Sequence, residues 1–237
     1  TVPLVRLAAL FARQKDYAKT VDSLRRAQKL APGDPAITRD LVLAQLLSGK
    51  PDDALKEAKS LQTTMPKLAA GFALEGDVHA ARQQWPQAER AYRDALKVEP
   101  ASDALAIKLH TTLNRAGKAA EAEAMAKKWL AEHPKDVGFR VYLAERALAD
   151  KNLRSAVTHY QAVVALQPDN VVALNNLAWT AGQLGDPKAI GYAERPVRLA
   201  PDNAAALDTL GTLLVSKGDA TKGLEYRTRA AEIAPKR

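Results

Sequence analysis

The sequence predicts an all-α protein in which consecutive helical hairpins stack against one another. Three observations support this fold class. Hydrophobic residues make up 47% of the 237 residues while aromatic residues make up only 5%, proline recurs at a fixed interval, and small residues recur at fixed positions between the prolines. Much of the hydrophobic content is alanine, which favours closely packed helices over a β-sandwich.

The recurring proline defines an internal repeat that fills the chain. Its intervals are 34 residues, except for one of 33, and the residues are Pro32, Pro66, Pro100, Pro134, Pro168, Pro201 and Pro235. When this proline is placed at position 32 of a repeat, residues 1–237 form a single array of seven repeats: 1–34, 35–68, 69–102, 103–136, 137–170, 171–203 and 204–237. A period of this length is the signature of a solenoid.

Each repeat is predicted to contain two helices. Positions 2–14 carry apolar residues at helical spacing, and four of the repeats have glycine at position 15, which is a natural helix stop. A second helix is expected to begin at position 17 or 18, where Pro51, Pro86 and Pro187 suit the first turn because no hydrogen-bond donor is lost there. The proline at position 32 ends it. A hairpin of this kind can cover its apolar face only with the next hairpin.

The pattern resembles the tetratricopeptide repeat (TPR) family over all 237 residues. Shared features are the 34-residue period, small residues at positions 8 and 20, the proline at position 32, and an aromatic residue at position 24 in two repeats. Residues 69–102 fit the family best, through Phe72, Gly76, Trp85, Ala88, Tyr92, Ala95 and Pro100. Departures from the pattern are Thr20, Glu75, His110, Gly223 and Arg227. The resemblance implies a right-handed superhelical solenoid of seven TPR hairpins, whose first helices line a concave groove.

The last two repeats carry a narrower resemblance. Residues 171–237 are similar to the C-terminal end of the bacterial TPR-repeat lipoproteins of PEP-CTERM/exosortase systems. This implies a role in a bacterial envelope, exopolysaccharide or protein-sorting system. It also implies a periplasmic, membrane-anchored parent whose lipidated start lies outside this chain. Without that resemblance, a cytoplasmic location is expected. The start at Thr1 without a signal-peptide pattern suggests a fragment or a processed form.

Composition and spacing argue against an enzyme. The chain has no cysteine, so disulfides and thiolate metal sites are excluded. The four histidines occupy different positions in their repeats, and no pair has the i, i+4 spacing of two zinc ligands on one helix; they are His79, His110, His133 and His159. The glycines mark turns and form no phosphate-binding loop. We therefore expect no catalytic residue, no metal site and no cofactor.

The remaining role is binding of a protein or peptide segment in the concave groove. By the resemblance, positions 2, 5, 9, 12 and 13 line this groove. They are apolar and small near the N-terminus, at Val5, Ala9 and Leu43, and more polar towards the C-terminus. The candidate peptide-binding residues are Arg39, Asp77, Thr111, Glu145, Asn175, Trp179, Asp208 and Thr212. Trp179 is expected either to contact the peptide or to pack between adjacent hairpins.

Two alternatives to a peptide-binding scaffold follow from the sequence. The net charge of +8 and the helical repeat are compatible with RNA binding, as in the similar pentatricopeptide arrays. Those arrays have a period of 35 residues, whereas the period here is 34, and the predicted groove carries both signs of charge. Nucleic acid is therefore the less favoured partner. Self-association is the second alternative, because exposed terminal repeats can stack on a neighbour. No apolar run reaches the length of a membrane span.

Pro196 is an exception within the repeat. It occupies position 27, inside the predicted second helix of residues 171–203, and this repeat has also lost one residue. Proline removes a backbone hydrogen bond and clashes with the carbonyl four residues earlier. We therefore predict a continuous helix with a local kink at Pro196.

Overall fold

The computed structural model describes residues 1–233, and these residues form fourteen α-helices without any strand. This confirms the predicted fold class, an all-α helical-repeat solenoid. Pro235 lies outside the described residues. The helices are α1 (Val2–Arg13), α2 (Tyr17–Leu30), α3 (Pro35–Leu47), α4 (Pro51–Thr64), α5 (Ala69–Ala81), α6 (Trp85–Val98), α7 (Asp103–Arg115), α8 (Ala119–Glu132), α9 (Val137–Ala149), α10 (Leu153–Leu166), α11 (Val171–Gln183), α12 (Ala189–Leu199), α13 (Ala204–Ser216) and α14 (Ala220–Ile233).

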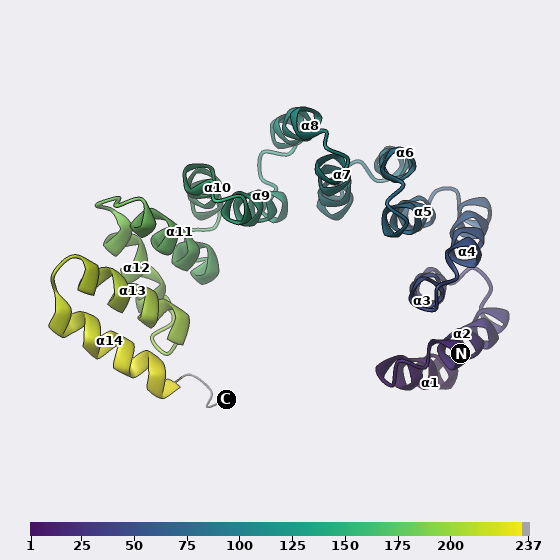
Figure 1. Ribbon diagram of the computed structural model, residues 1–237, viewed down its shortest axis with the longest axis horizontal. Helices are drawn as coiled ribbons and strands as arrows, with labels where there is room; N and C mark the ends of the chain where they lie inside the picture. Colours follow the sequence, from purple (N-terminus) through teal and green to yellow (C-terminus); the bar gives the residue numbers. More distant parts are fainter. Residues whose placement is uncertain (234–237) are drawn as a thin grey trace. The chain divides into compact units, whose positions relative to one another are not determined.

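The helices pack in two compact parts, which we call the N-terminal block (Thr1–Pro134) and the C-terminal block (from Lys135 onward). Within each block, every helix packs against the next one along the chain. In the N-terminal block, the odd-numbered helices follow one another along the inner side of a curve, and the even-numbered helices lie outside them (Figure 1). The N-terminal block therefore presents a row of first helices on one side and a row of second helices on the other.

A left-handed residue at position 15 ends the first helix of every repeat. These residues have φ between 58° and 95°, and they are Lys15, Gly49, Gln83, Gly117, Lys151, Gly185 and Gly218. In each case the backbone N–H of the following residue donates to the carbonyl five residues earlier, at 2.8–3.0 Å. This bond is typical of a Schellman-type helix end. Glycine adopts the conformation without steric cost, and the three other residues adopt it under strain.

The interior of each hairpin is built from small or closely fitted residues at two positions. Position 20 is buried in all seven repeats, and its residues are Thr20, Ala54, Ala88, Ala122, Ala156, Ala189 and Gly223. Position 8, which faces it from the first helix, is also buried throughout; its residues are Ala8, Val42, Gly76, His110, Ala144, Ala178 and Gly211. A Cβ atom on Gly76 would lie 2.5 Å from the ring of Tyr92. The two helices of a hairpin therefore approach closely enough to limit side-chain size.

The repeat at residues 171–203 corrects one prediction. Pro187 was expected in the first turn of the second helix, but α12 begins two residues later, at Ala189, and has 11 residues where the other second helices have 14. Asp186 explains the shift, because its side chain accepts from the Lys188 N–H at 2.8 Å and its carbonyl accepts from the Ala189 N–H at 3.1 Å. These bonds hold residues 186–189 in a tight turn, and this turn accommodates the one-residue deletion in the repeat.

Pro196 lies inside α12, which continues past it to Leu199. Its ring is buried, at the position where three other repeats have a buried alanine. The helix is continuous as predicted, and the kink remains a prediction. Because proline has no N–H, the carbonyl of Tyr192 lacks the backbone partner that it would have in a regular helix.

Replacing Gly117 with Ala should destabilise the protein by about 1–2 kcal/mol, because alanine must adopt φ near 77° there. A Cβ atom at Gly117 would meet nothing within 4 Å, so the cost comes from the backbone alone. The reverse change, Gln83→Gly, should stabilise by about 0.5–1 kcal/mol. Urea unfolding followed by circular dichroism measures both changes, and equal stability of Gly117→Ala and the parent chain would contradict the strain at position 15.

Replacing Pro196 with Ala should raise the melting temperature by several degrees. The substitution restores one helix hydrogen bond and removes a steric conflict worth about 3 kcal/mol, against a smaller loss of buried apolar surface. Differential scanning calorimetry measures the shift. Pro201→Ala is the matched control, because Pro201 is exposed just after the end of α12 and should give no gain. A lower melting temperature for Pro196→Ala would refute the strain argument.

Candidate functional site

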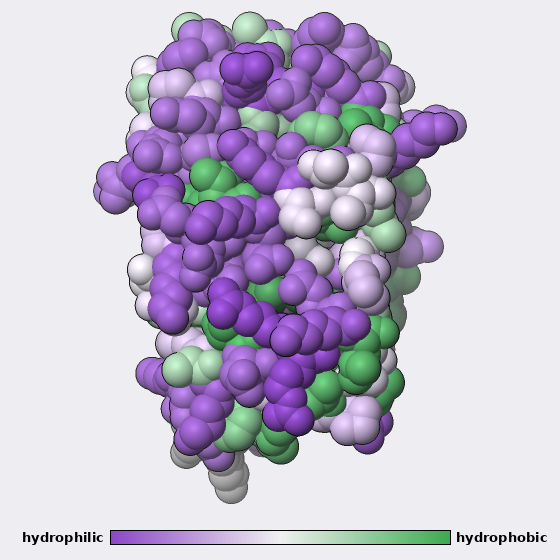
Figure 2. Space-filling view, turned by 90° about the vertical axis from the view of Figure 1, so that its right-hand side faces the viewer, coloured by the Kyte–Doolittle hydropathy of each residue, from purple (hydrophilic) through white to green (hydrophobic). Residues whose placement is uncertain are grey.

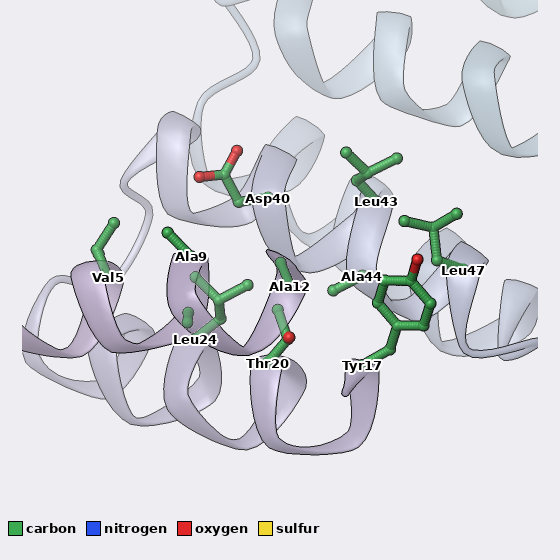
Figure 3. A pocket seen from close by; sticks show the side chains of 11 residues that line it. Val5, Ala9, Ala12, Tyr17, Thr20, Leu24, Asp40, Leu43, Ala44 and Leu47 are labelled. Atoms are coloured by element: carbon green, nitrogen blue, oxygen red, sulfur yellow. The ribbon is translucent and has the colours of Figure 1, made fainter. Parts of the chain in front are cut away.

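An apolar cavity of about 270 Å³ opens on the first-helix side of the N-terminal block. We call it the N-terminal recess. Helices α1 and α3 form its two sides, and α2 lies beneath it (Figure 3). Its lining residues are Val5, Ala8, Ala9, Ala12, Tyr17, Thr20, Leu24, Asp40, Leu43, Ala44 and Leu47. Nearly all of this lining is aliphatic or aromatic, so the recess fits an apolar side chain.

Small residues on α1 open the recess. Ala8, Ala9 and Ala12 leave space beside α3 that larger side chains would fill. Leu24, which is only 2% exposed, lies beneath. The hydroxyl of Thr20 donates to the Asp16 carbonyl at 2.8 Å, so this polar group is satisfied within the helix. The base of the recess is therefore formed by a buried leucine and by a threonine whose hydroxyl already has a partner.

Two leucines on consecutive turns of α3 form one rim of the recess. Leu43 is 56% exposed and Leu47 is 53% exposed. They lie on the same face of the helix, since residues four apart do so. Exposed leucines beside an apolar cavity bring together more apolar surface than single scattered ones, and such surface is typical of interaction sites.

The charges at the recess are paired. Asp40 is the acidic residue of the lining, and its carboxylate accepts from the Nε and an Nη atom of Arg39 at 3.1 and 3.0 Å. Arg39 is one of the predicted groove residues. The pair places one neutralised polar group beside the leucine rim.

Asp77, a second predicted groove residue, is engaged within the protein. Its carboxylate accepts from the Tyr92 hydroxyl at 2.7 Å and pairs closely with the Lys108 ammonium. Burial, and then the neighbouring Asp77 carboxylate, raise the pKa of Tyr92 above its usual value. Lys108 also lies 5.8 Å from the centre of the Tyr92 ring. Asp77 thus joins α5 to α6 and α7. Thr111 is half-buried on α7.

In the C-terminal block, the predicted residues lie on the first helices of three successive repeats. Trp179 is 45% exposed on α11, so its ring is not buried between hairpins. Asn175, one turn earlier, is half-buried, and its side-chain oxygen has no hydrogen-bond partner among the described residues. Asp208 is exposed and pairs with Arg227 at 3.2 Å. Glu145 on α9 and Thr212 on α13 are exposed.

Sequence reasoning gave priority to polar side chains and left the leucine rim and Tyr17 out of the candidate set. Leu43 was placed in the groove, but its pairing with Leu47 was not recognised. Two leucines at i and i+4 are the same signal that marks a buried helix face, so the sequence does not separate the two cases. The enclosure of the recess depends on α1, α2 and α3 together, which no single repeat specifies.

Two specific features are absent from residues 1–233. They contain no group of three His, Asp or Glu side chains placed to hold a metal ion. No helix in the same range is both long and apolar enough to span a bilayer. His159 is half-buried on α10, and burial together with the nearby Arg140 guanidinium lowers its pKa below the usual value.

Comparisons with known proteins agree with this architecture. Residues 74–137 and 111–171 match the family model of the tetratricopeptide repeat. Anaphase-promoting complex subunit 7 of Arabidopsis thaliana is 28% identical over 156 residues, which are 65% of this chain and 28% of that protein. The chain thus corresponds to less than a third of that relative. Residues 74–171 are therefore similar to the tetratricopeptide repeat, and proteins that carry this repeat are in general scaffolds for protein–protein interaction.

Three solved structures illustrate the shared fold. The C-terminal part of a TPR repeat-containing protein from Cytophaga hutchinsonii has a TM-score of 0.64 at 16% identity, covering 98% of this chain and 96% of that one. The MamA protein has a TM-score of 0.55 at 22% identity, covering 71% and 93%. Yeast Tom70 has a TM-score of 0.57 at 15% identity, covering 98% and 55%. At these identities the likeness concerns the fold alone.

Replacing Tyr92 with Phe should destabilise the protein by about 1–3 kcal/mol, because the half-buried Asp77 carboxylate loses a 2.7 Å hydrogen bond. Urea unfolding measures the loss. Tyr226→Phe is the matched control, since the Tyr226 hydroxyl has no hydrogen-bond partner among the described residues, and it should change stability by less than about 0.5 kcal/mol. Equal effects of the two substitutions would contradict the structural role assigned to Asp77.

Proposed function

We propose that this chain is a non-enzymatic scaffold that binds a segment of a partner protein along its first helices. The N-terminal recess anchors an apolar side chain of that segment. The observation that carries the proposal is the combination of a 270 Å³ apolar cavity with the exposed leucines Leu43 and Leu47 at its rim. Binding energy at protein interfaces is concentrated where a large side chain fills such a pocket. In the N-terminal block, Arg39 and Thr111 would contribute polar contacts to the same segment. In the C-terminal block, the candidate groove residues would contact a bound segment from the first helices of their own block; they are Glu145, Asn175, Trp179, Asp208 and Thr212.

The recess suits one side chain rather than a free small molecule. Its volume of about 270 Å³ lies near the lower end of the range of small-molecule pockets, about 300–1,000 Å³. Polar groups that would orient a small ligand are few, because the Thr20 hydroxyl and the Asp40 carboxylate already have partners. A peptide instead gains most of its contacts outside the pocket, along the rim.

A displayed library of short peptides tests the proposal directly. Peptides selected on the parent chain should share a large apolar residue at one position. They should bind Leu43→Ser at least about tenfold more weakly, which corresponds to the loss of an anchoring contact of about 1.4 kcal/mol. Leu10→Ser is the matched control, because Leu10 is 55% exposed and lies outside the recess.

Two outcomes would contradict the proposal. Selected peptides without a shared apolar position would remove the anchoring role of the recess. An equal loss of affinity in Leu43→Ser and Leu10→Ser would show that the binding follows general exposed hydrophobicity. Ala9→Phe provides a second check, since its ring should occupy the recess and prevent binding while the exposed helix position tolerates it.

We also propose that residues 1–237 form one array of seven repeats in a right-handed superhelix. The support for the single array is the recurrence of the left-handed residue at position 15 through both blocks.

We further propose that the array serves a bacterial envelope, exopolysaccharide or protein-sorting system as part of a lipid-anchored parent. The support for this role is the resemblance of residues 171–237 to repeat lipoproteins of such systems. Localisation of the full-length protein by membrane fractionation, with and without globomycin to block lipoprotein processing, tests this role.

Self-association through terminal repeats is a further proposal. Leu7 occupies position 7 and is 36% exposed, whereas its equivalent Leu41 is fully buried beneath its neighbours. A second copy could cover Leu7 in the same way. Light scattering over a range of concentrations tests this, and a constant monomer mass would contradict it.

A further inference from the structure

A polar crevice of about 540 Å³ lies in the N-terminal block, apart from the recess. Its walls are the second helices α4 and α6, and its floor is α5, whereas first helices form the rim of the recess. The polar residues that matter here are Lys59 and Gln62 from α4, Glu75 and His79 from α5, and Gln87 and Arg90 from α6. Seen from the side on which α2 and α4 lie in Figure 1, the surface of the molecule is mostly hydrophilic (Figure 2). A polar crevice on the second-helix side is therefore a feature distinct from the apolar recess.

Glu75 makes the floor of this crevice polar. It occupies position 7, where the other six repeats have leucine, and five of those leucines are buried. The Glu75 carboxylate accepts from the Gln62 amide at 2.7 Å. Its other oxygen lies 3.7 Å from His79 Nε2 and 3.8 Å from Lys59 Nζ. Glu75 therefore holds a lysine and a histidine over the crevice, which a leucine could not do.

The acceptors in the crevice are satisfied. Gln62 and Lys59 share the Glu75 carboxylate, and Asp94, which also lines the crevice, pairs with Lys97 at 2.7 Å. His79 is engaged as well, since its Nδ1 lies 2.7 Å from the side-chain oxygen of Gln84. An incoming cation would therefore have to displace existing partners.

The donors on the two walls remain available. Arg90 on α6 makes no ion pair or hydrogen bond through its guanidinium among the described residues, and neither does the Gln87 amide. Lys59 on α4 is exposed and has only the 3.8 Å contact with Glu75. An arginine guanidinium with five unused N–H groups and an ammonium with spare donors match a carboxylate. The unused hydrogen-bonding groups of the crevice are thus donors, which suit an anion.

We propose that this crevice is a second interaction site, which binds an acidic side chain of a partner protein between Lys59 and Arg90. The net charge of +8 favours acidic partners at long range. The charge of Glu75 does not prevent entry of a carboxylate, because Gln62, His79 and Lys59 surround it. The planar guanidinium of Arg90 would donate two hydrogen bonds to the incoming carboxylate. The Lys59 ammonium would supply a second positive charge, and the Gln87 amide would supply a neutral donor. The proposal is independent of the recess, because the two cavities share no residue.

Fluorescence anisotropy with a labelled hexaglutamate peptide tests this site on the full chain. The peptide should bind at low salt, and a hexaglutamine peptide of the same length should not. Arg90→Gln and Lys59→Gln should each weaken binding at least about fivefold, and Arg90→Lys should recover part of the loss. Both positions are exposed, so thermal unfolding should show that the variants fold like the parent.

Matched controls separate a site from general attraction. Lys56→Gln and Arg26→Gln each remove one exposed cation that does not line the crevice, and they should weaken binding less than about twofold. Equal weakening by the control variants would overturn the proposal, as would equal binding of hexaglutamine or no binding of hexaglutamate. Tighter binding of inorganic phosphate than of hexaglutamate, abolished by Arg90→Gln, would also overturn it in favour of a phosphate site. Leu43→Ser should leave hexaglutamate binding unchanged. A negative result for peptide binding at the recess would therefore not count against this site.

Discussion

The close approach of the two helices in each hairpin is the constraint on which the rest of the structure depends. Positions 8 and 20 face one another and are buried in every repeat, and their residues are mostly alanine or glycine. At Gly76 the neighbouring Tyr92 ring leaves no room even for a methyl group. Because the helices lie this close, the apolar stripe of each hairpin can be covered by the next one. The left-handed residue at position 15 makes the turn tight enough for this contact.

Both proposed sites arise where one repeat departs from its neighbours within this constraint. At the recess, small residues on α1 and outward-facing leucines on α3 leave an apolar cavity between two repeats. At the crevice, Glu75 replaces a leucine and gathers Lys59, Gln62 and His79 around its carboxylate. Repeated packing supplies the frame, and single substitutions supply the chemistry. Such a frame can hold different sites on its first-helix and second-helix sides.

The period of 34 was sufficient to predict the helices, because proline, glycine and alanine have local backbone and size effects that sequence shows directly. The left-handed residues at Lys15, Gln83 and Lys151 were not foreseen, since nothing in a lysine or glutamine indicates positive φ. The start of α12 depended on the turn at Asp186. The pairing of Asp77 with Tyr92 and Lys108, and the opening of the recess and the crevice, depend on contacts between repeats that a single repeat does not encode.

The unfolding free energy of Gly76→Ala tests the close approach most directly, because helix propensity and packing predict opposite signs. Propensity alone predicts a gain of about 1 kcal/mol. A Cβ atom 2.5 Å from the Tyr92 ring predicts instead a loss of about 1–3 kcal/mol. Gly191→Ala on α12, where a Cβ atom meets nothing within 4 Å, should show the gain. A gain for Gly76→Ala equal to that for Gly191→Ala would contradict the account.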